Sequence, residues 1–184
     1  MLVEAALILP VMVLLVLGIM EFGLLFTSYS TTTAASRSGA RLAATAYSQA
    51  PPNSAGQIAA AGQIALATAA DLQVLNNAEP IGMAIYKVNP SSTDGAPIGG
   101  FPGANMAGGC STDCIRFSWN SATGEFVRTS GSWTNADACG VTVDSIGVYV
   151  EARHDYISGI LGRTRNVSGH TVMRLEPLPA DQCS

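Results

Sequence analysis

The first 26 residues of the chain carry a nearly unbroken apolar pattern. Residues 5–20 hold no charged side chain, and apolar residues continue to Phe26 with Glu21 as the one charged interruption. A helix needs about 20 apolar residues to cross the hydrocarbon core of a bilayer. Residues 2–26 reach that length when Glu4 and Glu21 are included. The pattern therefore predicts an apolar helix that can lie in a membrane or pack in a filament.

The helical pattern continues after this segment, although small and hydroxyl-bearing residues replace the large apolar ones. Apolar residues recur at roughly helical spacing as far as Pro51-Pro52, where a proline pair ends the pattern. We expect a single helix over residues 2–48, on the order of 70 Å long at about 1.5 Å per residue. That length exceeds a small domain, so its N-terminal half should project, with Pro10 as a candidate kink. The small residues after Tyr29 are expected to face the rest of the protein.

The pattern after the proline pair predicts a second helix and about five strands. Residues 55–75 are Ala-rich with isolated large apolar residues, which predicts a helix that packs back onto the first. Residues 89–109 are rich in Gly, Pro and Ser, which predicts a long surface loop, and residues 154–161 are expected to form an irregular connection. Segments that alternate apolar and polar residues, or that flank the turn sequence NSATG, are typical of antiparallel strands. These predicted strands span 81–88, 114–119, 125–129, 145–153 and 166–175.

Together these elements predict an α+β fold with two parts. Residues 1–50 form the long helix, of which 1–26 is the apolar membrane or filament-core segment. Residues 51–184 form a globular head. We expect the head to be an antiparallel sheet packed on the C-terminal half of the long helix, because that packing removes the apolar strand faces from water.

The two acids of the apolar segment are its most informative polar residues. A carboxylate buried without a partner among apolar side chains is costly, so each should have one. Glu4 either pairs with the α-amino group of a neighbouring subunit in a filament, or lies in the first helical turn beside lipid headgroups, where the helix dipole favours an acid. Glu21, at the far edge of the segment, is expected to be interfacial, with an inter-subunit role as the alternative.

The apolar segment has no basic residue on its N-terminal side, and the first basic residue is Arg37. Secretory signals and single-pass anchors usually carry basic residues beside their apolar core. We therefore expect a basic leader to have preceded Met1 and to have been removed. Cleavage on the N-terminal side of an apolar helix leaves that helix in the mature protein.

The C-terminal half of the chain contains four cysteines, Cys110, Cys114, Cys139 and Cys183. An even number of cysteines in a chain outside the cytosol predicts two disulfides. A zinc site is the alternative, but Cys110 and Cys114 have no matching Cys/His pair, so no metal is expected. Two disulfides allow three pairings. We favour Cys114–Cys139, which closes the predicted hairpin and its following loop, with Cys110–Cys183 tying down the tail.

Composition and the remaining motifs argue against nucleic-acid binding and catalysis. Charged residues make up 12% of the chain, against about 25% in typical soluble proteins. The formal net charge is −4 and no Lys/Arg cluster occurs, so nothing attracts nucleic acid. The Gly-rich loop lacks the GxxxxGK[ST] pattern, so no cofactor is expected.

Two histidines and one glycosylation pattern complete the candidate chemistry. His154, Asp155 and His170 could join serines in a catalytic set, but no GxSxG motif accompanies them, and catalysis needs a positioned nucleophile, base and orienting group. We therefore expect a protein that is not an enzyme. Asn166 begins an Asn-Val-Ser triplet, a glycosylation pattern that is frequent by chance.

The segment VEAALILPVMVLLVLGIMEFG, residues 3–23, resembles the N-terminal motif of TadE-like pilins and pseudopilins of tight-adherence (type IVc) pilus systems. In that family an acidic residue, usually the fifth of the mature chain, opens the apolar helix. A proline follows, and a Glu-Phe-Gly triplet closes the helix. The matching residues are Glu4, Pro10, Glu21, Phe22 and Gly23.

Two further stretches extend the resemblance over most of the chain. Residues 34–44 are similar to the second half of the family's helix, and residues 146–162 with 170–177 are similar to a C-terminal pattern of one variant. Glu4 stands one position earlier than the usual fifth residue, so the exact mature N-terminus stays open.

The resemblance implies a structural subunit that polymerises through its apolar helix into an extracellular filament and supports adhesion. It also implies cleavage by a prepilin peptidase, assembly by a secretion ATPase and platform proteins, and transfer from the cytoplasmic membrane to the cell surface. The helix would contact inner-membrane lipid before assembly and copies of the same chain afterwards. The alternatives are a minor subunit that primes assembly at the tip, and a membrane-anchored adhesin that never polymerises. A secreted enzyme is disfavoured.

Overall fold

The computed structural model describes residues 2–50, 54–133, 135–139, 142–159 and 162–183, without the side chains of residues 2–5 and 54. Helices α1 (Leu2–Gln49) and α2 (Ser54–Leu72) come first along the chain. Five strands follow and form one antiparallel sheet in the order β3-β2-β1-β4-β5. Their bounds are β1 (Ala78–Lys87), β2 (Cys114–Asn120), β3 (Glu125–Ser132), β4 (Ser145–Asp155) and β5 (Thr164–Arg174). Two 3₁₀ turns, η1 (Ala104–Met106) and η2 (Ala180–Gln182), lie in the loop before β2 and in the tail.

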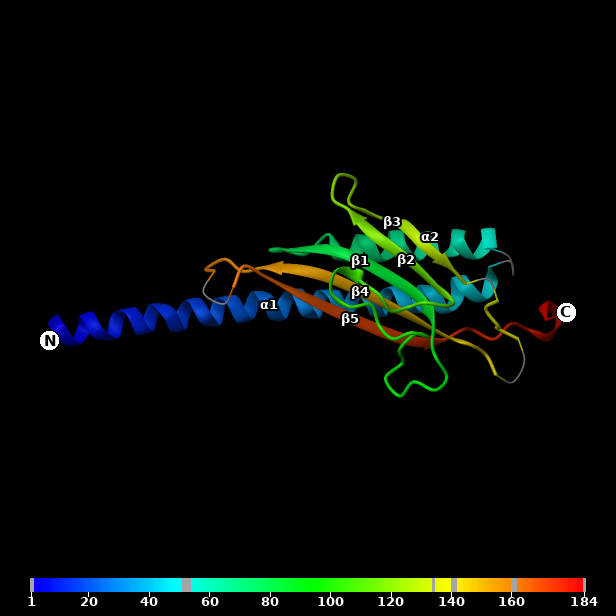
Figure 1. The fold of residues 1–184 in the computed structure, drawn as a ribbon, viewed down its shortest axis with the longest axis horizontal. Helices are drawn as coiled ribbons and strands as arrows, with labels where there is room; N and C mark the ends of the chain where they lie inside the picture. The colour runs from blue at the N-terminus through cyan, green and yellow to red at the C-terminus, as the bar shows by residue number, and fades with distance from the viewer. Residues whose placement is uncertain (1, 51–53, 134, 140–141, 160–161, 184) are drawn as a thin grey trace.

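The N-terminal part of α1 projects from the head as a bare rod (Figure 1). The helix continues for 48 residues, with Pro10 inside it, which corresponds to about 72 Å. Most large apolar side chains between residues 7 and 20 are half or more exposed, from 49% at Val13 to 72% at Ile19. The predicted α+β fold, with a projecting helix, a second helix and an antiparallel sheet, is confirmed.

Small residues on the C-terminal half of α1 set its distance from the head. Ala35, Ala40 and Ala43 are fully buried there, as the sequence predicted for the stretch after Tyr29. Gly39 leaves the least room, because a Cβ at that position would lie 2.6 Å from Oγ1 of Thr68 on α2. The two helices therefore approach as closely as their side chains permit.

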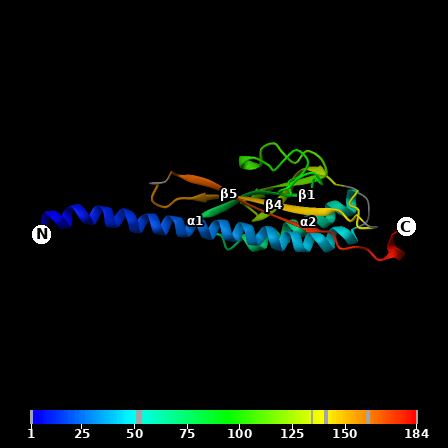
Figure 2. The ribbon, with the colours of Figure 1, turned by 90° about the horizontal axis from the view of Figure 1, so that it is seen from below.

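The sheet has a different cover on each face. Figure 2 shows the helices on one side and the long loop between β1 and β2 on the other. On β4, Ile146, Val148 and Val150 belong to the core beneath the helices, whereas Tyr149 belongs to a second cluster under the loop. This alternation follows from the period of two along a strand. The predicted surface loop is therefore a packed layer, with the Phe101 ring 5.8 Å from the Tyr149 ring.

Several strands extend beyond their predicted ends. The sequence assigned residues 154–161 to an irregular connection, but β4 includes His154 and Asp155, which pair with Arg165 and Thr164 of β5. Pairing between neighbouring strands overrides weak local preference at such positions. β1 also begins earlier than predicted, and its register shifts between Pro80 and Gly82.

The disulfide pairing differs from the prediction. The structure joins Cys110 to Cys114 and Cys139 to Cys183, with Cα–Cα distances of 5.8 and 5.7 Å. The predicted Cys114–Cys139 and Cys110–Cys183 pairs are wrong. All four cysteines do form disulfides, as the sequence indicated.

The sheet register explains this pairing. Cys114 lies opposite Tyr86, and residues directly opposite each other share a face, so Cys114 points under the loop with Cys110. Cys139 lies elsewhere, beside the C-terminal tail, since the N–H of Leu178 donates to the carbonyl of Ala138 at 2.9 Å. Hairpin closure was therefore the wrong criterion for choosing a partner.

Candidate functional site

The projecting segment of α1 carries most of the exposed large apolar side chains among the described residues. Its side chains are apolar on every side of the helix, and those of residues 6–16 are exposed throughout. In the described part of the chain, α1 is the one helix long and apolar enough to cross a membrane by length and composition, with a window of mean hydropathy 2.5. A helix that is apolar all round belongs in a bilayer or in the interior of a bundle.

The predicted assembly residues lie along this segment in different environments. Glu4 belongs to α1, although its side chain is outside the described part. Phe22 is 61% exposed, and a Cβ at Gly23 would meet open space. Pro10 is exposed within the helix. Pro10, Phe22 and Gly23 are thus available to partners outside the subunit, whereas Glu21 is buried within it.

Glu21 is buried where the rod meets the head, with 3% of its surface exposed. The backbone N–H of Ser158, in the connection between β4 and β5, donates a hydrogen bond to its Oε1. The sequence suggested an interfacial or inter-subunit Glu21, but the structure gives this carboxylate a partner within its own chain. Glu21 therefore fixes the tip of the β4–β5 hairpin to the side of α1.

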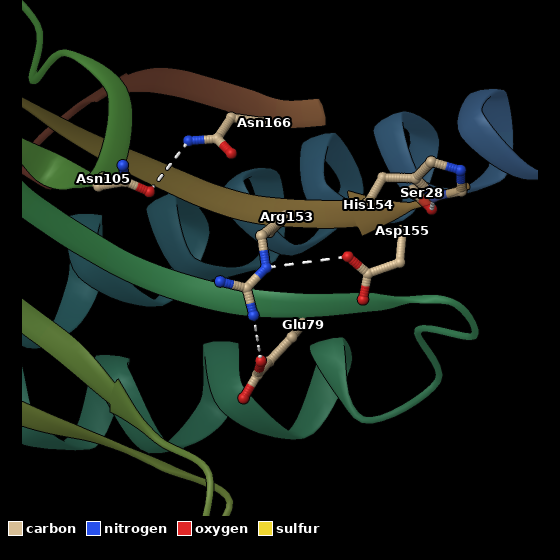
Figure 3. A network of polar contacts seen from close by, with 7 residues as sticks. All are labelled: Ser28, Glu79, Asn105, Arg153, His154, Asp155 and Asn166. Atoms are coloured by element: carbon tan, nitrogen blue, oxygen red, sulfur yellow. Dashed lines mark hydrogen bonds and ion pairs between the residues drawn. The ribbon is translucent and has the colours of Figure 1, made fainter. Parts of the chain in front are cut away.

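His154 reinforces the same junction. Its Nδ1 lies 3.0 Å from the hydroxyl of Ser28 on α1, and the Ser28 hydroxyl also lies 3.1 Å from the carbonyl of Leu24. The Ser28 hydroxyl thus lies within hydrogen-bond distance of both the His154 ring and the helix backbone. His154 is fully buried. Its role is to hold β4 against the helix, as the close-up in Figure 3 shows.

The three residues considered for catalysis do not come together. His154 faces α1, while the His170 ring stacks near Phe101 on the opposite face of the sheet, with ring centroids 4.4 Å apart. Asp155 points away from His154 and lies 3.9 Å from Arg153, which also pairs with Glu79 at 2.9 Å (Figure 3). This arrangement is a set of strand and surface contacts rather than a nucleophile, base and orienting group.

Glu151 is a buried polar residue that sequence analysis missed. Its carboxylate accepts the backbone N–H groups of Asn105 and Met106 at 3.0 and 2.8 Å, and the Asn166 side-chain amide at 2.9 Å. Asn105 and Met106 both have a φ of 58°, a conformation that residues other than glycine rarely adopt. The Glu151 carboxylate stabilises this turn by accepting both backbone N–H groups. Arg116 donates to the carbonyl of Met106 at 2.8 Å.

The Glu151 contacts clamp the long loop onto the sheet. One of the donors to Glu151 is the side-chain amide nitrogen of Asn166, the residue that begins the glycosylation triplet. An acid in the middle of a strand that otherwise alternates cleanly is the sequence signal for such a clamp, because a carboxylate under a loop needs several donors.

An open apolar groove lies beside the junction, between α1 and the start of β5. Its volume is about 580 Å³. Phe22, Phe26 and Tyr29 form the helical wall, together with Leu25, and residues 165–168 of β5 form the other wall. Phe22, Phe26 and Tyr29 remain 61%, 71% and 52% exposed. The groove therefore continues the apolar surface of the rod onto the head.

Residues 1–41, the rod and the first turns that enter the head, match the family model described as TadE-like protein. The N-terminal helix is TadE-like. The resemblance seen in the N-terminal sequence is thereby confirmed over these residues, and it is consistent with a pilin-like component of a tight-adherence pilus. No curated protein and no solved structure matches the chain. The matched residues include the exposed rod, Glu21 and Ser28, so the TadE-like segment and the junction with the head overlap.

Proposed function

We propose that this chain is a structural subunit that polymerises through its TadE-like helix into an extracellular tight-adherence filament and supports adhesion. The observation that carries the proposal is the rod itself. A helix of this length that is apolar on every side, and that its own head does not cover, needs either lipid or other helices around it. The TadE-like match over residues 1–41 supports a pilus as the setting.

The proposed mechanism is an exchange of lipid for protein. Before assembly the rod lies in the cytoplasmic membrane. During assembly, rods from successive copies pack together while the heads stay outside. Lipid and helix are similarly apolar, so close side-chain packing rather than removal from water favours association. Fixing the head to α1 through Glu21 and His154 lets the subunit move as one body.

The proposed partners are copies of the same chain, inner-membrane lipid before assembly, and a pilus machinery of prepilin peptidase, ATPase and platform proteins. The two histidines considered for catalysis, His154 and His170, lie on opposite faces of the sheet. We accordingly propose a structural role rather than catalysis.

Filaments sheared from the source cells test the proposal. Electron microscopy and mass spectrometry should show filaments with this chain as the dominant component. A dominant share identifies a shaft subunit, a trace at filament ends identifies a minor priming subunit, and exclusive recovery in the membrane fraction identifies an anchored adhesin. The last two results contradict the proposal.

A matched pair of variants places the interaction on the rod. Leu14 on α1 and Leu66 on α2 are each 54% exposed. Leu14→Glu should abolish filaments, because a carboxylate in a helix bundle or bilayer is strongly disfavoured. Leu66→Glu, with the same chemical change on the head, should leave filament yield unchanged. Equal effects of the two substitutions would contradict a rod-based assembly.

A further inference from the structure

The groove between α1 and β5 has the shape and composition to receive another helix. Farther along the two elements are in contact, with the hydroxyls of Ser36 and Thr171 3.0 Å apart. A Cβ on Gly169 would lie 2.8 Å from the backbone of Thr33. Toward the start of β5 this contact gives way to the groove of about 580 Å³. One end of the groove is therefore closed by packing and the other end opens toward the rod.

Arg165 supplies the positive charge of the groove. It pairs with His154 across the β4–β5 ladder, and His154 faces α1. Directly opposite residues share a face, so Arg165 lies on the helix side of β5, among the residues that line the groove. It is exposed, and among the described residues it makes no ion pair. Glu21 is committed to Ser158 and Asp155 faces the other side of the sheet.

The rod of a second copy is the occupant that fits this surface. It is helical and apolar, and between residues 2 and 20 its one charged side chain is Glu4. The copy's own rod cannot fill the groove, because α1 is one continuous helix that leads away from it (Figure 1). An apolar groove with one cation thus faces an apolar helix with one anion, supplied by the same chain.

We infer that the groove binds residues 2–7 of a second copy, with Arg165 as the counter-charge of that copy's Glu4. This inference rests on the proposed filament function and deepens it by naming the contact. Glu4 then has a partner on a neighbouring head, in place of the α-amino group. Glu4 and the middle of the groove, near Phe26, are 22 residues apart along α1. At about 1.5 Å per residue, the two contacting copies are offset along the filament by about 33 Å.

Charge exchange in the full-length chain tests the pairing. Arg165→Glu and Glu4→Arg should each lower the yield of sheared filaments at least about tenfold, and the double variant should recover most of the loss, since the charges are restored in exchanged positions. Arg163→Glu is the matched control, because Arg163 is also exposed but does not line the groove, and it should leave the yield unchanged. The amount of each variant in the membrane fraction, together with the formation of both disulfides, shows whether that variant still folds.

Cross-linking identifies the occupant directly. Phe26→p-benzoylphenylalanine in assembled filaments should capture residues 2–7 of another copy, whereas the same substitution at Leu66 should not. If the unmodified chain forms no filament, the proposed function and this inference both fail. If filaments form but Arg165→Glu assembles normally, the double variant shows no recovery, or the cross-links reach lipid or another segment, this inference alone is overturned.

Discussion

The contact between α1 and α2 at Gly39 gives a prediction with a sign opposite to that of ordinary helix propensity. Replacing Gly by Ala inside a helix usually stabilises it by about 1 kcal/mol. At Gly39 the added Cβ would lie 2.6 Å from Oγ1 of Thr68 and 3.3 Å from Cγ1 of Val148. Overpacking of this kind costs about 1–3 kcal/mol. Gly39→Ala should therefore destabilise the protein by a net amount of up to about 2 kcal/mol.

Two companion variants isolate the cause. A Cβ at Gly62, on α2, meets nothing within 4 Å, so Gly62→Ala should stabilise the protein by about 0.5–1 kcal/mol. In a Thr68→Ala background the atom nearest to the new methyl group is removed, while Cβ of residue 68 remains at 3.8 Å. Gly39→Ala should then be neutral or stabilising, with a coupling of about 1–2 kcal/mol between the two sites.

Thermal unfolding of the full-length chain in mild detergent, followed by circular dichroism, measures these differences. One kcal/mol corresponds to about 2–4 °C in Tm for a chain of this size. Gly39→Ala should melt up to about 8 °C below the unchanged protein, and Gly62→Ala should melt above it. A Gly39→Ala protein that melts at or above the unchanged protein, or a double variant without coupling, would refute the close approach of α1 and α2.

Two further predictions concern the head. Cys139 and Cys183 are 44 residues apart, whereas Cys110 and Cys114 are 4 apart. Loop-closure entropy therefore predicts that Cys139→Ser with Cys183→Ser costs about 4 kcal/mol, and Cys110→Ser with Cys114→Ser about 2 kcal/mol. Equal losses in urea unfolding, or the reverse order, would contradict the pairing. Burial raises the pKa of Tyr86 far above its ordinary value, which is about 10. The folded state then holds this proton more tightly than the unfolded state, so the contribution of Tyr86 to stability is complete below about pH 10 and is lost as the pH rises above that value. Tyr86→Phe should flatten the alkaline fall in Tm between about pH 10 and 11.5, and an unchanged slope would show that Tyr86 is not the titrating group.

The elements with a strong local pattern could be predicted from the sequence. The rod could be predicted because a run of large apolar residues has few alternative structures, and the small residues after Tyr29 were correctly expected to face the rest of the protein. Strand ends were less accurate, since His154 and Asp155 become part of β4 through pairing with β5, a segment ten residues later. The composition of a segment does not show which other strand it will pair with.

The disulfides show a second limit. The number of cysteines predicted two bonds, but the choice of partners depends on which face of the sheet each side chain occupies. Cys114 shares a face with Tyr86 and Cys110, and the register that decides this is set by the whole ladder. Sequence spacing alone favoured a hairpin closure that the sheet does not allow.

The contacts at the junction between rod and head also depend on segments that are far apart in the sequence. Glu21 stands at the end of the apolar run, and the sequence predicted an interfacial position for it, with an inter-subunit role as the alternative. In the fold its carboxylate meets the N–H of Ser158, 137 positions later, and the nearby Ser28 meets His154. A buried acid with such a partner fixes the orientation of the rod relative to the head, because breaking the contact leaves a desolvated charge. The groove lined by Phe26 and Arg165 lies beside this junction, so the residues that orient the rod also fix the surface that we assign to the next copy.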